Sequence, residues 1–227
     1  MPFNFQTFKT RTLTAIVFAA VMLIGLLWNI WSFIVLFTII HFGCWWEFVR
    51  LMRRIKPLNY GYFLPFGVLY ITMPVLVMIY LRTSGFLIWD GNDFLFKILP
   101  CAIIFSLWIN DTMAYIVGSL IGRTPFSKIS AKKTWEGTIG GAVLCVVVIG
   151  LVGWRSKFYS VTDWIIIASL CAFFGTLGDL LESKIKRLAG VKDSGSLLPG
   201  HGGFLDRFDS LLVATPFVWL YVYFFMR

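Results

Sequence analysis

Long runs of apolar residues dominate the sequence, and short basic stretches separate them. From Thr12 to Trp46 the chain contains no Asp, Glu, Lys or Arg. As a single helix this run would be about 52 Å long, whereas the hydrocarbon core of a bilayer is roughly 30 Å thick. In its middle, Trp28 to Ser32 places an Asn between tryptophans, which are typical of the membrane interface. The pattern therefore predicts two membrane-spanning helices joined by a tight turn.

Further apolar runs predict the remaining spans. They are Pro57–Leu81, Ile98–Gly122, Gly137–Trp154, Trp164–Leu181 and Ser210–Met226. We predict an all-α, polytopic integral membrane protein with about seven transmembrane helices (about six to nine) and no soluble domain. The segment Phe86–Ile121 leaves an alternative open, because it could form one pass or two. Of the polar residues inside apolar runs, we interpret His41 as an interhelical hydrogen-bond donor and Glu47 as a snorkelling residue at a helix end.

Composition and charge agree with a membrane protein. Hydrophobic residues make up 59% of the chain and charged residues 14%, whereas a soluble domain carries about a quarter charged residues. The net charge is +9, but the basic residues lie in short loops that alternate with apolar runs, which indicates membrane orientation and anionic ligands rather than nucleic acid. The four cysteines all lie in apolar stretches and are interpreted as small core residues: Cys44, Cys101, Cys145 and Cys171.

The basic loops also set the predicted domain organisation. We predict one membrane domain over residues 1–227, with spans one to three in 1–97 and catalytic spans four to seven in 98–227. The positive-inside rule places the N-terminus and the loops 122–136 and 182–207 in the cytoplasm.

The first of these loops mixes lysines with hydroxyl groups. Lys132 and Lys133 are interleaved with Ser127, Ser130 and Thr134. Hydroxyl and ammonium groups suit phosphate oxygens, although the lysines can equally be simple orientation signals. The loop alone is therefore a weak indication of a site.

The second loop and its flanks gather carboxylates. If the sixth span continues as a helix, Asp179, Glu182 and Lys186 lie on one face. Asp206 and Asp209 are also three residues apart, at the start of the last apolar run, where a helix N-terminus favours negative charge.

One alternative is that Asp206 merely caps the last helix while the neighbouring charges are solvated. That alternative leaves Asp179, Asp209 and the clustered cations unexplained. Convergent carboxylates beside lysines and arginines are typical of a magnesium–nucleotide site, and Gly200, Gly202 and Gly203 permit close backbone approach to a ligand.

Asp111 lies well inside an apolar segment. An intramembrane carboxylate is a functional candidate because its burial is costly. It can equally be a structural partner of Asn110, Thr112 or Tyr115, and the sequence leaves both readings open.

These residues together resemble a known family. The stretches Ser183–Arg187, Lys192–Asp193 and Pro199–Asp209 resemble the signature of phosphatidate cytidylyltransferases, also called CDP-diacylglycerol synthases. Asp111–Tyr115 and Ser130–Gly137 resemble two further motifs of that family. The resemblance covers residues 100–227, with Ala131 where the family usually has proline and Met113 where it usually has glycine.

The resemblance implies a magnesium-dependent nucleotidyltransferase of the inner (cytoplasmic) membrane, commonly a homodimer, with its active site on the cytoplasmic side. Its substrates would be CTP and phosphatidate, a second cation being left open, and its products CDP-diacylglycerol and pyrophosphate. The predicted metal ligands are Asp179, Asp206, Asp209 and Glu182. The predicted catalytic residues add Lys192, Arg207 and His201 to the three aspartates. The predicted substrate-binding residues are Lys132, Lys133, Thr134, Ser183, Lys184, Lys186, Arg187, Gly202, Gly203 and Asp111.

Two rival functions use similar residues. A CTP-dependent lipid kinase would move the γ-phosphoryl group to an alcohol and release CDP, but it needs a base near a neutral hydroxyl. A transporter or channel would place ionisable groups near the midplane of several spans. Here, apart from Asp111, the ionisable groups cluster at one membrane face.

Overall fold

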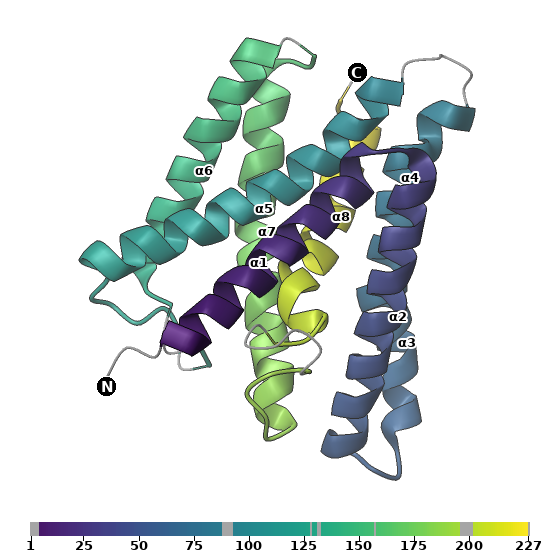
Figure 1. Cartoon of the computed structure of the whole chain (residues 1–227), viewed down its shortest axis with the longest axis vertical. Helices are drawn as coiled ribbons and strands as arrows, with labels where there is room; N and C mark the ends of the chain where they lie inside the picture. Colours follow the sequence, from purple (N-terminus) through teal and green to yellow (C-terminus); the bar gives the residue numbers. More distant parts are fainter. Residues whose placement is uncertain are drawn as a thin grey trace.

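The structure is a computed structural model that describes residues 5–87, 93–127, 129–130, 133–156, 158–195 and 202–226 (Figure 1). Within these ranges the chain forms helices and no strand, which confirms the all-α class. The α-helices are α1 (Phe5–Leu27), α2 (Ile30–Ile55), α3 (Leu64–Gly67), α4 (Met73–Leu87), α5 (Asp93–Ile121), α6 (Trp135–Ser156), α7 (Val161–Leu188) and α8 (Leu205–Phe224).

Five helical segments of the described chain are long and apolar enough to cross a membrane. They are Ile30–Ile55, Tyr60–Ser84, Lys97–Ile121, Trp135–Ser156 and Val161–Leu188. The polytopic class is thus confirmed, and five of the seven predicted spans meet these criteria of length and composition within the described residues. The other two predicted spans are also helical: Thr12–Leu27 is a shorter apolar stretch of α1, and α8 begins with the charged residues Asp206, Arg207 and Asp209.

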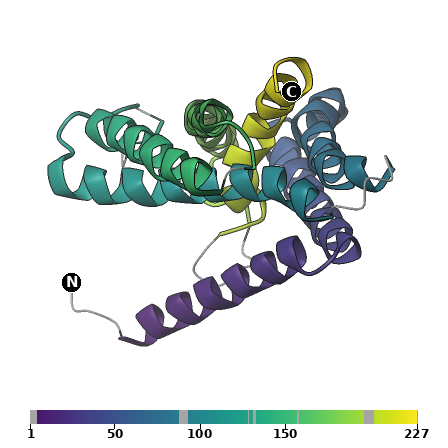
Figure 2. The same cartoon turned by 90° about the horizontal axis from the view of Figure 1, so that it is seen from above.

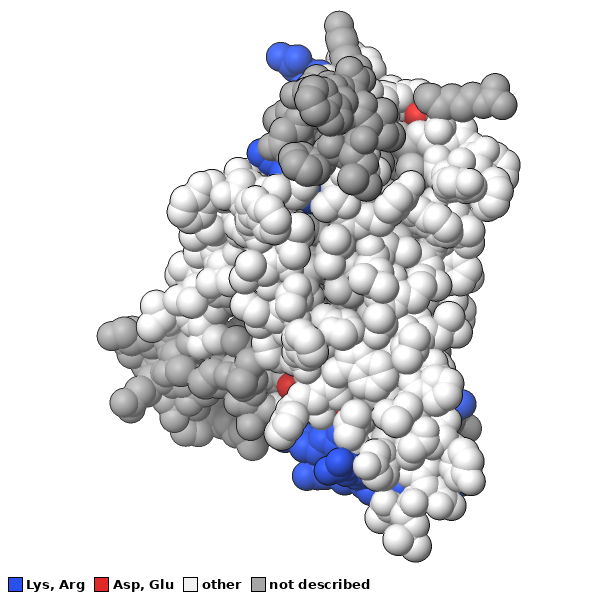
Figure 3. All heavy atoms as spheres, turned by 90° about the vertical axis from the view of Figure 1, so that its right-hand side faces the viewer, with Lys and Arg blue, Asp and Glu red and all other residues white. Residues whose placement is uncertain are grey.

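The surface of the molecule fits a bilayer. Figure 3 shows one face whose middle zone is almost free of charged residues, with lysines and arginines gathered at both ends. Many large apolar side chains are exposed along the helices, among them Val35 and Ile39 of α2 and Phe173 of α7. Lipid tails tolerate such exposure, whereas water would not.

The predicted turn between the first two spans is confirmed. Asn29 is the N-cap of α2, where its side-chain oxygen accepts the Ser32 N–H at 2.8 Å and the Ser32 hydroxyl accepts the Asn29 N–H at 3.1 Å. This reciprocal capping box satisfies two N–H groups that have no partner inside the helix. The turn is tight because the polar pair starts α2 only two residues after α1 ends.

The predicted span Pro57–Leu81 is a composite rather than one regular helix. A 3₁₀ turn (Tyr60–Phe63), α3 and a π-helical turn (Val68–Thr72) lead into α4. Pro74 lacks the N–H that would bond the carbonyl of residue 70, and the widened π turn directly precedes it. By contrast, the segment predicted to form one or two passes is continuous as α5 from Asp93 onward, with Pro100 inside it.

Helices α5, α6, α7 and α8 form the compact part of the molecule, and α1 lies along one side of it (Figures 1 and 2). Glycines let neighbouring backbones approach closely. A Cβ on Gly141 of α6 would lie 2.7 Å from the backbone N of Ala114 on α5, and one on Gly178 of α7 would collide with the backbone carbonyl of Asp209 on α8. These crossings bring Asp179 and Asp209 into the same region as α5.

The four cysteines are free, and three of them are fully buried, as expected for small core residues. His41 is a hydrogen-bond partner between helical segments, as predicted, with its Nε2 3.0 Å from the Thr72 hydroxyl. Trp45 Nε1 donates to the same hydroxyl at 2.9 Å. Thr72 thus ties the π turn to α2.

Candidate active site

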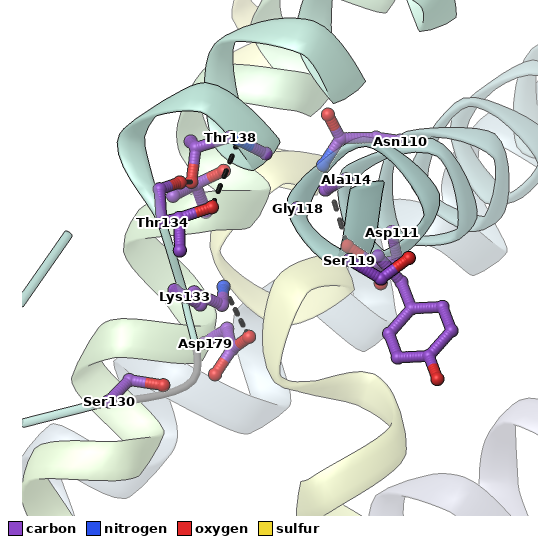
Figure 4. A pocket seen from close by; sticks show the side chains of 13 residues that line it. Asn110, Asp111, Ala114, Gly118, Ser119, Ser130, Lys133, Thr134, Thr138 and Asp179 are labelled. Atoms are coloured by element: carbon purple, nitrogen blue, oxygen red, sulfur yellow. Dashed lines mark hydrogen bonds and ion pairs between the residues drawn. The ribbon is translucent and has the colours of Figure 1, made fainter. Parts of the chain in front are cut away.

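A cavity of about 450 Å³ lies where α5, the start of α6 and the middle of α7 meet (Figure 4). Its volume is within the range of small-molecule sites. The charged and hydroxyl side chains that line it are Asp111, Tyr115, Ser119, Ser130, Lys133, Thr134, Thr138, Thr176 and Asp179. They come from all three of the regions that the sequence singled out: the first basic loop, the end of the sixth predicted span and the intramembrane aspartate.

Lys133 and Asp179 form an ion pair across this cavity (Figure 4). Both side chains are partly exposed, at 25% and 30% respectively, so the pair faces the open space rather than the core. The Ser183 hydroxyl donates to Asp179 Oδ1 from the next turn of α7 at 3.3 Å. Asp179 therefore orients the ammonium group while its carboxylate stays accessible to a ligand.

Asp111 lines the same cavity. Asp111 is exposed, and Asn110 Nδ2 donates a long hydrogen bond, 3.4 Å, to its Oδ1. A purely structural aspartate would have its acceptor sites used by protein donors. The structure thus places Asp111 at the cavity, and its functional role stays a prediction.

Asp209 lies behind this group of side chains. It is buried, its Oδ1 accepts the Ser210 N–H at 2.6 Å, and it is within electrostatic range of Asp179, Asp111 and Lys133. The prediction that Asp206 and Asp209 both lie in the first turns of the last helix is confirmed.

Thr134 and its loop are held by backbone contacts. The Glu136 side chain accepts the N–H groups of Arg123 and Thr124 at 3.2 Å, which closes the loop between α5 and α6. The Thr134 hydroxyl accepts the Gly137 N–H at 3.1 Å and so caps the start of α6. Lys132, predicted to bind substrate, lies outside the described residues.

Asp206, in the first turn of α8, belongs to a second cluster that joins this helix to the residues preceding it. Its Oδ1 accepts Lys186 Nζ at 2.6 Å, and its Oδ2 accepts the N–H groups of Ser194 (2.8 Å) and Gly203 (2.7 Å). Burial by itself raises the pKa of Asp206, but the Gly203 N–H and the Lys186 ammonium hold it well below its usual range. Asp206 therefore does not cap α8: it lies inside the first turn of that helix and binds N–H groups of the residues that precede it.

Lys186, predicted to hold a phosphate, is already paired inside the protein. It forms ion pairs with Glu182 and Asp206, and its side chain is 12% exposed. Glu182 is 1% exposed and turns toward Lys186 rather than the cavity. The three residues predicted to share one face of α7 thus have different surroundings. Asp179 lines the cavity, whereas Glu182 and Lys186 stabilise the second loop.

Glu47 is a residue whose role the sequence analysis missed. The interpretation as a snorkelling helix-end residue is wrong, because Glu47 is 3% exposed and accepts the N–H groups of Phe204 and Leu205 at 3.0 Å. The same face of α2 carries Arg50, whose guanidinium donates to the Ser194 carbonyl. A single Glu at the end of an apolar run gives no sequence signal for such a contact, because its partners lie far along the chain.

The other predicted residues differ in their surroundings. Lys184, Arg187, Lys192 and Arg207 are exposed, and Arg187 Nη1 donates to the Val191 carbonyl at 3.3 Å. Gly202 has a positive φ of 84°, a conformation that favours glycine, and Gly203 is buried. His201 and Gly200 lie outside the described residues.

The carboxylates offer oxygen ligands but do not converge on one point. Within the described ranges, no group of three Asp, Glu, His or Cys side chains lies close enough to hold a metal ion. The predicted metal ligands lie in two different places, since Asp179 lines the cavity and Asp206 binds the loop before α8. The assignment of Asp179, Asp206, Asp209 and Glu182 as metal ligands stays a prediction.

Comparison with known proteins gives a consistent match over the region that forms the cavity. The sequence model described as the cytidylyltransferase family matches residues 66–225. The chain is 46% identical over 117 residues to phosphatidate cytidylyltransferase 4, chloroplastic, of Arabidopsis thaliana, a match that covers 49% of this chain and 29% of that protein.

Bacterial relatives match the chain to a similar degree. Identity is 46% over 113 residues with the phosphatidate cytidylyltransferase of Staphylococcus saprophyticus (48% of this chain, 43% of the relative). It is 45% over 119 residues with that of Synechocystis (51% and 40%). The matches thus span less than half the length of these relatives.

Proposed function

The chain belongs to the cytidylyltransferase family, and from that premise we propose that it condenses phosphatidate with CTP to give CDP-diacylglycerol and pyrophosphate. The observation that carries the proposal is the cavity in which Lys133, Asp179 and Asp111 meet, because it lies within the matched region. The relatives' names supply the reaction, and the cavity supplies side chains suited to it.

The reaction makes modest demands on the protein. A phosphate monoester has a second pKa near about 6, so phosphatidate is already largely ionised at neutral pH. One of its oxygens attacks the α-phosphorus of CTP, and the bond between that phosphorus and the oxygen bridging to the β-phosphorus breaks as pyrophosphate leaves. No side chain needs to remove a proton, which fits a cavity lined by hydroxyls, carboxylates and an ammonium group. Catalysis then consists of in-line positioning and charge neutralisation.

Each side chain has a defined part in this proposal. The Lys133 ammonium neutralises phosphate oxygens, and Asp179 holds it in place through their ion pair. The hydroxyls of Ser130 and Thr134 line the same cavity and would donate hydrogen bonds to phosphate oxygens. Arg207 and Lys192, exposed at the same end of the molecule, would meet the pyrophosphate.

A magnesium ion is compatible with the donors of this cavity. Asp111 and Asp179 offer carboxylate oxygens, the ligands that hard cations prefer, and the donor that reaches Asp111 from the described residues lies 3.4 Å away. These two residues would hold the ion, and the buried Asp209 adds negative charge behind them. Bound there, magnesium would neutralise charge on the triphosphate.

The position of the cavity also suggests on which side of the membrane it opens. The cavity lies near the ends of α5 and α7 that adjoin the basic loops, so we propose that it opens on the cytoplasmic side of the inner membrane. The diacylglycerol tails would stay in the bilayer, and only the headgroup would reach the cavity. The homodimer implied by the resemblance also stays a prediction.

The position of a radioactive label in CTP tests the reaction. We expect label at the α-phosphorus to enter the lipid and label at the γ-phosphorus to leave as pyrophosphate, with phosphatidate required and diacylglycerol inactive. Label from the γ-position in the lipid, with CDP released, would instead indicate the kinase. Transfer of neither label from CTP in the presence of magnesium and phosphatidate would exclude both.

A further inference from the structure

Glu47 of α2 acts as the N-terminal acceptor of a different helix. Its Oε1 accepts the Phe204 N–H at 3.0 Å and its Oε2 accepts the Leu205 N–H at 3.0 Å. The first N–H groups of a helix have no partner within that helix, and Phe204, the N-cap of α8, makes no side-chain cap bond of its own. A carboxylate at this position is favoured electrostatically as well. The start of α8 is therefore fixed from α2.

The same carboxylate also fixes both sides of the loop before α8. The Ser194 hydroxyl lies 2.7 Å from Glu47 Oε2 and 2.8 Å from Asp206 Oδ2, so it links the two carboxylates. A Cβ on Gly203 would collide with both carboxylate oxygens of Glu47, and one on Gly195 would collide with Oε1. The two glycines therefore let both arms of the loop close onto a single side chain.

This contact is coupled to the cavity through the first turn of α8. Asp209 lies one turn beyond Leu205, and its backbone carbonyl lies directly against Gly178, the residue before Asp179. A shift of the first turn of α8 would therefore move Asp209 relative to Asp179. A misplacement of about 1 Å at a reacting centre can cost about 10²-fold in rate.

From these contacts we propose that Glu47 is a positioning residue for the reaction. It holds Ser194, Gly203 and the first turn of α8 in the geometry that the cavity needs, without touching substrate. The inference rests on the proposed function, because its effect on turnover presupposes the reaction.

The decisive variant is Glu47→Gln, which keeps the shape but turns an NH₂ group toward backbone N–H groups. We expect kcat per folded enzyme to fall at least about tenfold while the KM for CTP stays within about threefold. Hydrogen–deuterium exchange of the peptide that contains Phe204 and Leu205 should accelerate. A merely structural role would lower the yield and thermal stability but leave kcat of the folded fraction unchanged, and that result would overturn the proposal.

A matched control lies at the opposite end of the molecule. Asp163 accepts hydrogen bonds from Ser160 (2.6 Å) and Tyr221 (2.6 Å) at the start of α7. Asp163→Asn should leave kcat and the exchange of the 202–209 region unchanged. If it lowered kcat as much as Glu47→Gln does, the effect would be a general one of removing a carboxylate, and the assignment to Glu47 would fail.

Gly203 supplies a double-mutant cycle. Gly203→Ala should lower kcat in the wild-type background, since its Cβ displaces Glu47, but should add less than about threefold in a Glu47→Ala background. A full, additive penalty in that background would mean that Gly203 acts on substrate independently of Glu47, contrary to the proposal. Should the Glu47 variants not fold, Ser194→Ala retains both backbone bonds to Glu47, and a kcat loss of about three- to tenfold is expected.

The exchange measurement separates the two proposals. If wild-type protein transfers no cytidylyl group, the proposed reaction fails, yet protection of the Phe204 and Leu205 amides still tests the contact. If the wild type is active and those amides exchange as fast in the wild type as in Glu47→Gln, the positioning role fails alone.

Discussion

Two clusters of carboxylates lie toward the same end of the helices, and they differ in what occupies their oxygens. In the loop cluster, Glu47 and Asp206 accept hydrogen bonds from backbone N–H groups, with the Ser194 hydroxyl and the Lys186 ammonium alongside. In the cavity cluster, the hydrogen bond that reaches Asp111 from the described residues is a long one from Asn110, and Asp179 pairs with Lys133 while both side chains stay partly exposed. Carboxylates saturated by the protein fix its architecture, whereas those left unsaturated are available to a ligand.

The largest expected effect is that of Asp179→Asn in the cavity cluster. Removing this charge frees Lys133 and deletes an oxygen ligand, so we expect kcat to fall about 10³-fold, or about 4 kcal/mol. Thermal stability should change by only a few degrees, because the side chain is partly exposed. Turnover within tenfold of wild type, measured with α-labelled CTP, would remove Asp179 from the site.

Asp206→Asn should mainly lower the stability of the protein, whereas Asp179→Asn should mainly lower kcat. The variant leaves buried donors from Lys186 and Gly203 poorly paired, at a cost of about 3 kcal/mol in unfolding free energy. The measurement is thermal unfolding in detergent, compared with Asp179→Asn. Equal unfolding midpoints in the two variants would break the distinction between the clusters.

Asp111→Asn should have an intermediate effect on turnover. Asn preserves the shape and the contact with Asn110 but weakens the carboxylate set around the cavity, so we expect a loss of about 30-fold, or about 2 kcal/mol. Raising the magnesium concentration should recover part of the rate if the lost group is a metal ligand. An unchanged rate at all magnesium concentrations would return Asp111 to a structural role.

Lys184→Ala should have the smallest effect. The residue is exposed on α7 and does not line the cavity. We expect kcat/KM for CTP to change less than about threefold, as for a solvated surface charge. A loss above tenfold would mean that phosphate is bound outside the cavity and would support the sequence-based assignment of Lys184.

The sequence predicted those features that depend on local pattern. Charge-free runs predicted most helices, and Asn29 with its tryptophans predicted the first turn, because apolar length and capping are local properties. The π turn before Pro74 was not predicted, since a proline in an apolar run is compatible with several helix distortions.

The candidate site was predictable in part for a related reason. Asp179, Lys133 and Thr134 were identified from charge and hydroxyl clustering, and they line one cavity. The division between Asp179 and its helix neighbours Glu182 and Lys186 was not predictable, because it depends on which helix packs against each side of α7. Glu47 was misread because its partners come from a distant part of the chain.

The contact between Glu47 and α8 joins residues 157 positions apart, and that separation orders the events of biosynthesis. When α2 leaves the ribosome, the backbone groups that will bind Glu47 do not yet exist, and a charged carboxylate is costly in hydrocarbon. Until Phe204 and Leu205 have been translated, Glu47 therefore lacks the backbone N–H donors that accompany its burial in the finished fold. The burial of Glu47 and the docking of α8 then occur together as a late step of folding. We therefore expect a chain arrested before residue 204 to insert its early helices but to have no activity.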